Sequence, residues 1–181
     1  MAIATMGNER IIITGFMGSG KSTVGRALAR LLECEMVDLD EVITHEDRAP
    51  WQIIEADGEP AFRVIETRAL GNALEVSSAR VIALGGGTWI LQRNRDLIKS
   101  HSAVIVWLDA PFTTCWARIQ ECRGNRPLAP TEAGAQVLYD KRRAVYELAD
   151  LVITVDHNKT TDDIAAEIVA QITQAPATRQ T

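Results

Sequence analysis

The stretch GFMGSGKS, residues 15–22, fits the GxxxxGK[ST] spacing of a phosphate-binding P-loop. Its glycines allow the tight backbone path that turns consecutive amide groups inward, and a helix that follows would add its positive N-terminal end. The apolar run IIIT precedes the motif and an amphipathic pattern follows it, which is the strand, loop and helix context that the motif requires. The sequence therefore predicts a nucleotide phosphate site and an enzyme that transfers phosphate from ATP.

Two side chains in this motif carry the predicted chemistry. Lys21 is expected to reach the β and γ phosphates, which makes it a candidate catalytic residue, and the Ser22 hydroxyl is expected to coordinate Mg²⁺. Further contacts to ATP are expected from the neighbouring residues Gly18, Ser19, Gly20 and Thr23.

Apolar runs alternate with stretches of helical spacing along the chain. The runs are expected to be buried strands, at residues 10–14, 36–39, 81–84, 103–108 and 151–155. Apolar positions in residues 23–32, and Ile164, Ile168 and Ile172 near the end, recur at helical spacing. Strands without polar alternation are typical of a sheet covered on both faces. We therefore expect a three-layer α/β/α fold with a five-stranded parallel sheet and ligands at the carboxyl ends of its strands.

Length, charge and cysteine content exclude several classes of protein. The 181 residues, 46% of them hydrophobic, suit one domain spanning residues 1–181. A formal net charge of -5 argues against a nucleic-acid binder. No secretion signal or membrane-spanning run is present, so we expect a cytoplasmic protein, and we expect a monomer. Three cysteines without CxxC spacing indicate reduced thiols rather than disulfides or a zinc site.

Two acidic residues follow the expected second strand. Asp38 and Asp40 flank Leu39, and the two-residue period of a strand would put both side chains on one face. One acid could then serve the metal and the other a substrate, since an acid that holds Mg²⁺ complements a P-loop. Paired acids after a strand also occur in solvated loops and helix caps, which is the alternative interpretation.

The P-loop continues as GFMGSGKSTVGRALA and is followed by VDLDEVI, GEPAFRVIE, LGGGTWI, NRPLA and RRAVYELAD. In this ordered set, from about residue 10 to residue 155, the chain resembles the shikimate kinases. The resemblance implies transfer of the ATP γ-phosphate to the 3-hydroxyl of shikimate, a step of aromatic amino acid biosynthesis through chorismate. It also implies a substrate-binding region at about residues 41–70 and a mobile lid at about residues 121–132.

The resemblance assigns roles to several of these residues. Asp38 matches the family's acid near Mg²⁺ and the reacting hydroxyl, where it acts as a base or orients, and Asp40 matches an acid that binds substrate hydroxyls. In the FRxxE pattern, Arg63 matches an arginine that grips the shikimate carboxylate, and helical spacing puts Glu66 beside it. An ordinary surface ion pair is the alternative.

Glycines and arginines complete the expected site. Gly85, Gly86 and Gly87 would let the shikimate pocket approach the backbone closely, although three glycines also make simple turns. By resemblance, Arg126 approaches the phosphates from the lid as a catalytic and ATP-binding residue, where the alternative is an ordinary basic loop. By resemblance, Arg142 is assigned to the substrate carboxylate, although Lys141 and Arg143 beside it are alternative candidates for that position. Arg118 could stack near adenine.

The chain departs from the family pattern in the substrate-binding region. Asp47, Ala49 and Pro50 replace the usual Gly, Ser and Ile, and Ile54 stands where an aromatic wall residue is common. The alternative functions are another small-metabolite P-loop kinase, acting for example on gluconate or a nucleoside monophosphate, and an ATP-binding regulatory protein that has lost catalysis.

Overall fold

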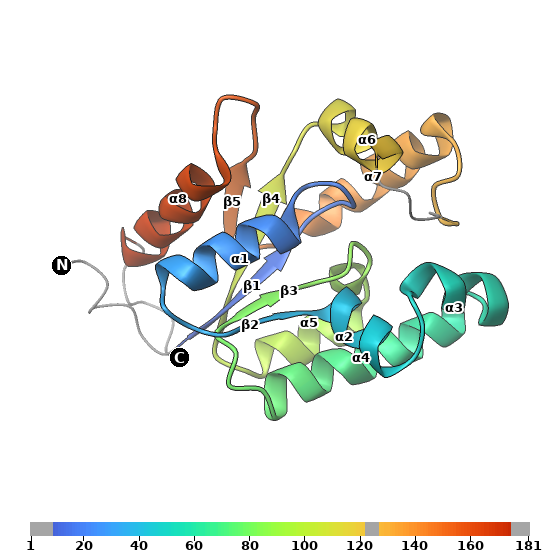
Figure 1. The fold of residues 1–181 in the computed structure, drawn as a ribbon, viewed down its shortest axis with the longest axis horizontal. Coiled ribbons are helices and arrows are strands. Elements are labelled where there is room, and N and C mark those ends of the chain that lie inside the picture. The colour runs from blue at the N-terminus through green and yellow to red at the C-terminus, as the bar shows by residue number, and fades with distance from the viewer. Residues whose placement is uncertain (1–8, 122–126, 175–181) are drawn as a thin grey trace.

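A five-stranded parallel sheet forms the centre of the molecule, with the strand order β2-β3-β1-β4-β5 (Figure 1). The computed structural model describes residues 9–121 and 127–174. Its strands are β1 (Arg10–Thr14), β2 (Met36–Asp38), β3 (Val81–Ala83), β4 (Ala103–Asp109) and β5 (Leu151–Thr154). Each expected strand agrees with the observed one to within one residue at either end, so the predicted α/β class and parallel sheet are confirmed.

Helices cover both faces of this sheet. In the described part of the chain they are α1 (Lys21–Leu31), α2 (Leu39–Glu46), α3 (Pro50–Asp57), α4 (Glu59–Glu75), α5 (Gln92–Lys99), α6 (Phe112–Glu121), α7 (Glu132–Tyr146) and α8 (Thr161–Gln174), with a 3₁₀ helix, η2 (Thr88–Ile90). Helices α1 and α8 pack together on one face, and α4 and α5 pack together on the other (Figure 1). This arrangement follows from right-handed connections between parallel strands.

The central strand β1 is apolar at residues 11–13 because both of its faces are covered. Ile12 pairs in register with Ile82 of β3 and Ile105 of β4, and the Ile12 side chain is completely buried. A continuous apolar run is the pattern that such a strand requires. The core therefore lies between β1 and the helices on either side of it.

Helix α1 begins directly after the phosphate loop. Gly20 precedes it with φ 100°, a left-handed conformation that glycine adopts without steric strain. Val24 and Leu28 are buried against the sheet, whereas Thr23 and Leu31, which we expected on the apolar face, are exposed. In the closing helix α8, Ile164 and Ile168 are buried as their spacing predicts.

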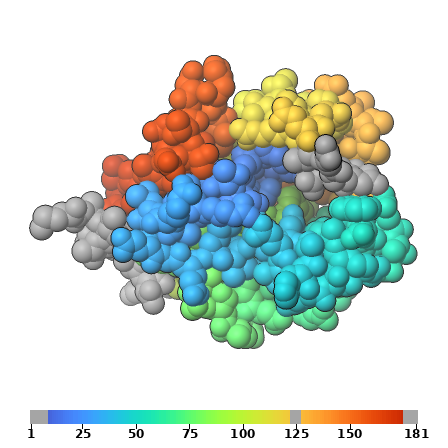
Figure 2. Space-filling model, in the orientation of Figure 1, coloured from blue at the N-terminus to red at the C-terminus, as the bar shows by residue number. Residues whose placement is uncertain are grey.

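The carboxyl ends of the strands meet at one edge of the sheet, where the loops that follow β1 and β3 and the N-terminus of α2 lie together. Helices α2 and α3 form a lobe at the same end of the molecule as α6 and α7 (Figure 2). Within residues 9–121 and 127–174, no helix is both long and apolar enough to cross a bilayer.

Candidate active site

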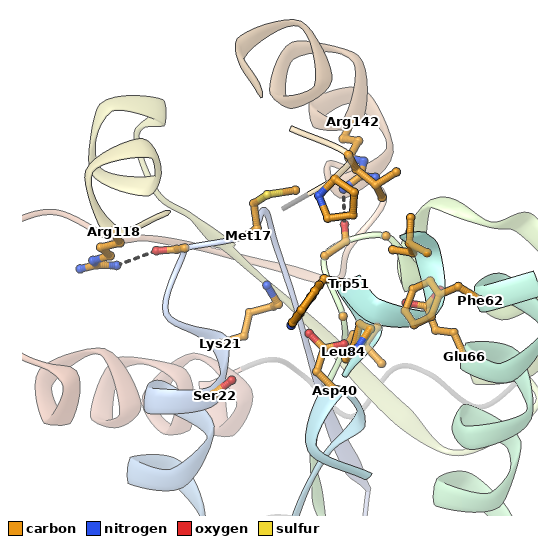
Figure 3. Close-up of a pocket in the computed structure, with 18 of the residues that line it drawn as sticks. Met17, Lys21, Ser22, Asp40, Trp51, Phe62, Glu66, Leu84, Arg118 and Arg142 are labelled. Carbon is orange, nitrogen blue, oxygen red and sulfur yellow. Dashed lines mark hydrogen bonds between the residues drawn. The ribbon is translucent and has the colours of Figure 1, made fainter. Parts of the chain in front are cut away.

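A cavity of about 450 Å³ opens at this edge of the sheet. One end is formed by the phosphate loop and the first turn of α1, and the other by α2, α3, α4, the loop after β3 and α7 (Figure 3). Most of the residues predicted for the site line it: Gly18, Gly20, Lys21, Ser22, Thr23, Asp40, Arg63, Gly85, Gly86, Gly87, Arg118 and Arg142. The structure thus brings the expected phosphate and substrate groups into one space.

The phosphate loop is held in shape by its glycines and by α6. Gly18 has φ 78°, and a β-carbon at this residue would stand only 2.6 Å from the backbone oxygen of Cys115. A side chain is therefore excluded both by conformation and by the close approach of α6. Lys21, at the first position of α1, donates a hydrogen bond from Nζ to the backbone oxygen of Phe16, 3.0 Å away. The ammonium group consequently lies over the loop that would surround a phosphate.

Two residues predicted to contact ATP differ in their placement. Ser19 is buried and does not line the cavity, its backbone N–H donates to the oxygen of Phe16, and its hydroxyl has no hydrogen-bond partner in the described structure. Arg118 is exposed at the cavity and donates from Nη1 to the backbone oxygen of Gly18, 3.0 Å away. The guanidinium of Arg118 therefore steadies the phosphate loop.

Asp38 and Asp40 do not lie on one strand, so the prediction that the two-residue period of a strand puts both side chains on one face is wrong. Strand β2 ends at Asp38 and helix α2 begins at Leu39, so the two-residue period of a strand does not connect the two acids. Asp38 is instead the N-cap of α2, where its Oδ1 accepts hydrogen bonds from the backbone N–H groups of Asp40 and Glu41. Asp40 stands in the first helical turn and lines the cavity, whereas Asp38 does not line it. Because the Asp38 side chain caps α2, strand β2 ends at Asp38, one residue before its predicted end at Leu39.

Arg63 is buried and held by two glutamates on its own helix. Its Nη1 donates to Glu66 Oε2 at 2.7 Å, and its Nη2 and Nε donate to Glu59 Oε1 at 2.8 and 3.1 Å. Burial alone would lower the pKa of Arg63, but the charges and hydrogen bonds of Glu66 and Glu59 outweigh it, so the pKa lies above its usual value. The guanidinium therefore stays charged and fixed in orientation.

Glu66 connects this arginine to the segment that follows β3. Its carboxylate is buried, and its Oε1 accepts a hydrogen bond from the hydroxyl of Thr88 at 2.7 Å. Gly85 makes room for the arrangement, because a β-carbon there would stand 2.8 Å from both Glu66 Oε1 and Asp40 Oδ1. Close approach, rather than a turn alone, is thus the reason for glycine at this position.

Contacts distinguish the three consecutive basic residues on α7, and the binding of the substrate carboxylate by Arg142 stays a prediction. Arg142 is buried, lines the cavity and donates from Nη1 to the backbone oxygen of Gly86 at 3.1 Å. Arg143 points elsewhere, forming hydrogen bonds to both carboxylate oxygens of Asp109, and Lys141 is exposed. Tyr146, one turn after Arg142, also donates to the oxygen of Gly86, at 2.5 Å. Arg142 and Tyr146 together hold the glycine loop.

The expected lid is described only in part. Arg126 lies outside the described residues, so its predicted approach to the phosphates stays a prediction. Pro127 and Leu128, which follow it, line the cavity.

Several cavity residues were not singled out from the sequence. Trp51 comes from the first turn of α3, Met17 from the phosphate loop and Glu121 from the end of α6. Glu59, which binds Arg63, was also missed, although its i,i+4 spacing was a usable signal. Phe62, the neighbour of Arg63 on α4, also lines the cavity.

Comparison with known proteins places the chain in one family. The shikimate kinase family profile matches residues 17–173. The shikimate kinase of Ruegeria pomeroyi is 33% identical over 169 residues, which cover 91% of this chain and 85% of the relative. That of Synechococcus elongatus is 39% identical over 152 residues, which cover 81% and 77% of the two chains.

Solved structures agree with this result. A shikimate kinase from Acinetobacter baumannii, in complex with shikimate, matches with a TM-score of 0.81 and 35% identity, covering 95% of this chain and 97% of its own. A gluconokinase from Sinorhizobium meliloti matches with a TM-score of 0.59 and 18% identity, covering 91% of each chain. The second similarity shows a shared fold alone.

Proposed function

The chain belongs to the shikimate kinase family of ATP-dependent phosphotransferases, and on that premise we propose how its cavity holds ATP and shikimate. The observation that carries the proposal is the composition of the cavity, which joins a phosphate loop to two buried arginines. ATP would lie at the phosphate-loop end, and shikimate at the end lined by Arg63, Arg142 and the loop after β3.

At the ATP end, the chain offers a positive charge and backbone donors to a triphosphate. Lys21 would leave the oxygen of Phe16 for the β and γ phosphates, where it stabilises the charge that develops during transfer. The first turn of α1, with Gly20, Ser22 and Thr23 at the cavity, adds backbone N–H groups and the positive end of the helix dipole.

Mg²⁺ fits the residues next to this end. Asp38 is only 8% exposed, and its Oδ1 accepts two backbone hydrogen bonds, whereas its Oδ2 has no hydrogen-bond partner among the described residues and is available to a cation. The Ser22 hydroxyl is likewise without a partner among the described residues and lines the cavity. No group of three acidic, histidine or cysteine side chains within the described ranges could hold a metal alone. Such a sparse donor set suits Mg²⁺, which takes its remaining ligands from phosphates and water.

At the acceptor end, two arginines face a small carboxylated ligand. Glu59 and Glu66 occupy Nε and one donor on each terminal nitrogen of Arg63, which leaves the other terminal N–H groups for a ligand carboxylate. Arg142 adds a second fixed charge, and Asp40 would accept hydrogen bonds from the ligand's hydroxyls. We propose that Asp38, at the end of β2, orients the reacting hydroxyl or accepts its proton.

The remaining assignments rest on the family resemblance. Residues 41–70 would form the substrate-binding region, residues 121–132 would close as a lid with Arg126 on the phosphates, and residues 1–181 would act as one kinase domain. We also propose a monomer, since residues of one chain line both ends of the cavity, and a cytoplasmic location.

A substrate panel with a metal titration tests this proposal. The protein should release ADP from ATP with shikimate, not with gluconate or a nucleoside monophosphate. Asp38→Asn should raise the Mg²⁺ concentration needed for half-maximal rate, and a metal dependence identical to that of the wild type would remove Asp38 from the metal site. Transfer to gluconate without transfer to shikimate would refute the acceptor assignment.

A further inference from the structure

Packing among the described residues does not explain the environment of Trp51. It is only partly buried, and it does not belong to the set of side chains that pack against the hydrophobic core. Within the described residues its ring makes no aromatic or cation–π contact, and its indole N–H has no hydrogen-bond partner. A tryptophan side chain stabilises a fold or a complex mainly by burying its ring and by donating a hydrogen bond from its indole N–H. Both interactions of Trp51 are therefore available to a ligand.

The position of Trp51 is nevertheless well determined by its helix. In the helix α3, residues two apart point in nearly opposite directions, and Ile53 is completely buried in the core. The first turn is fixed by a hydrogen bond from the N–H of Ala49 to Gln52 Oε1, and an ion pair joins Arg48 to Asp57 at the far end. The ring of Trp51 therefore faces away from the core because its helix is anchored, and Figure 3 shows it projecting into the cavity.

The wall beside Trp51 belongs to the acceptor end of the cavity. Ile54 lies one turn further along α3 and lines the same cavity, as do Phe62 and Asp40. Ile54 occupies the position where an aromatic wall residue was expected. Trp51 supplies an aromatic face one helical turn earlier, on the same side of the helix.

We propose that Trp51 is a specificity-determining residue of the acceptor site, whose indole ring covers one face of the acceptor's six-membered ring. The indole N–H donates a hydrogen bond to an oxygen of the same ligand. A flat aromatic face buries more of a cyclic acceptor than of an open-chain one, so Trp51 favours a carbocyclic polyol acid over a linear sugar acid. This inference rests on the proposed binding of shikimate at that end of the cavity.

Steady-state kinetics of two variants test the contact. Trp51→Ala removes the ring, and Trp51→Phe keeps an aromatic ring without the N–H. We expect Trp51→Ala to raise the KM for shikimate by about ten-fold or more, because truncating an aromatic anchor in a pocket removes much of its binding energy. Trp51→Phe should give a smaller rise, and both variants should keep the KM for ATP within about two-fold, a change worth less than ~0.5 kcal/mol.

Tryptophan fluorescence supplies a readout that does not need turnover. Addition of shikimate alone should change the emission of the wild type, and the change should be absent in Trp51→Phe. Trp116→Phe is the matched control, because Trp116 packs on Phe112 outside the cavity, and it should keep the change. Thermal unfolding of each variant shows that it is folded.

The outcomes separate this inference from the function on which it depends. A wild-type protein that does not phosphorylate shikimate would refute the proposed function. A wild type that does so, with Trp51→Ala unchanged in its KM for shikimate or shifted equally for both substrates, would overturn the role of Trp51 alone. Retention of the full fluorescence change in Trp51→Phe would overturn it as well.

Discussion

Gly87 lies against the guanidinium of Arg63 so closely that a β-carbon at residue 87 would stand 2.6 Å from Cζ. The guanidinium group cannot shift easily, because its hydrogen bonds to Glu59 and Glu66 hold it in place. The absence of a side chain at Gly87 and the fixed position of Arg63 are therefore parts of one arrangement. This relationship ties the glycine loop to Arg63, the arginine that we propose binds the acceptor's carboxylate.

Gly87→Ala should damage the acceptor site specifically. The added methyl group would displace the Arg63 guanidinium, and we expect the KM for shikimate to rise about ten-fold or more while the KM for ATP changes little. Gly71→Ala, on the same helix as Arg63, is the control, since its β-carbon would have no neighbour closer than 3.9 Å. Steady-state kinetics check both, and an unchanged shikimate KM in Gly87→Ala would contradict the arrangement.

The register on α7 predicts different effects for three consecutive residues. Arg142→Lys keeps the charge but loses the forked donors, so the KM for shikimate should rise about ten-fold. Lys141→Ala should be neutral because Lys141 is exposed. Arg143→Ala should lower the melting temperature instead, because it breaks the pairing with Asp109. A shikimate KM that responds to residue 141 or 143 as strongly as to residue 142 would show that the assigned register is wrong.

Lys21→Ala should abolish turnover and leave the fold intact. Removing the charge that stabilises the transferring phosphate should lower kcat by at least about 10²–10³-fold. Circular dichroism and thermal unfolding should match the wild type, and Lys99→Ala, an exposed lysine at the end of α5, should retain full activity. Substantial activity in Lys21→Ala would remove this residue from the reaction.

Stability should fall at alkaline pH because of a buried thiol. Burial raises the pKa of Cys115 from 9.0 to about 11, so the folded protein keeps the proton that the unfolded chain loses. The resulting loss of folding stability is small below pH 9, grows between about pH 9 and pH 11, and reaches roughly 2 kcal/mol near pH 10.5. Urea unfolding at pH 8 and 10.5 measures it. Cys115→Ala should lose less stability than the wild type between these values, and an equal loss would contradict the shift.

The fold could be predicted from the sequence because the patterns that indicate it are local. The apolar runs of a covered parallel sheet and the glycine spacing of the phosphate loop each depend on few neighbouring residues. The boundary at Asp38 was misplaced because a capping hydrogen bond competed with strand pairing. Ser19 was assigned to ATP by its place in the motif. Its side chain is buried, and its contact with ATP stays a prediction.

The charged residues of the site could be predicted from the sequence, whereas the apolar residues that line its walls could not. Arg63 and Arg142 stood in recognisable patterns, but only three-dimensional contacts distinguish Arg142 from its neighbours. Trp51 gave no signal, because nothing local shows that the ring of a tryptophan in a helix faces a cavity rather than the core. Arg126, beyond the described ranges, stays a prediction.

Release of ADP by the purified protein, measured with ATP and Mg²⁺ in the presence and absence of shikimate, tests the function most directly. We predict that ADP appears only when shikimate is added, and that one ADP is released for each shikimate phosphorylated. ADP release at the same rate without shikimate, or none with it, would contradict the assignment of this cavity to phosphate transfer from ATP to shikimate.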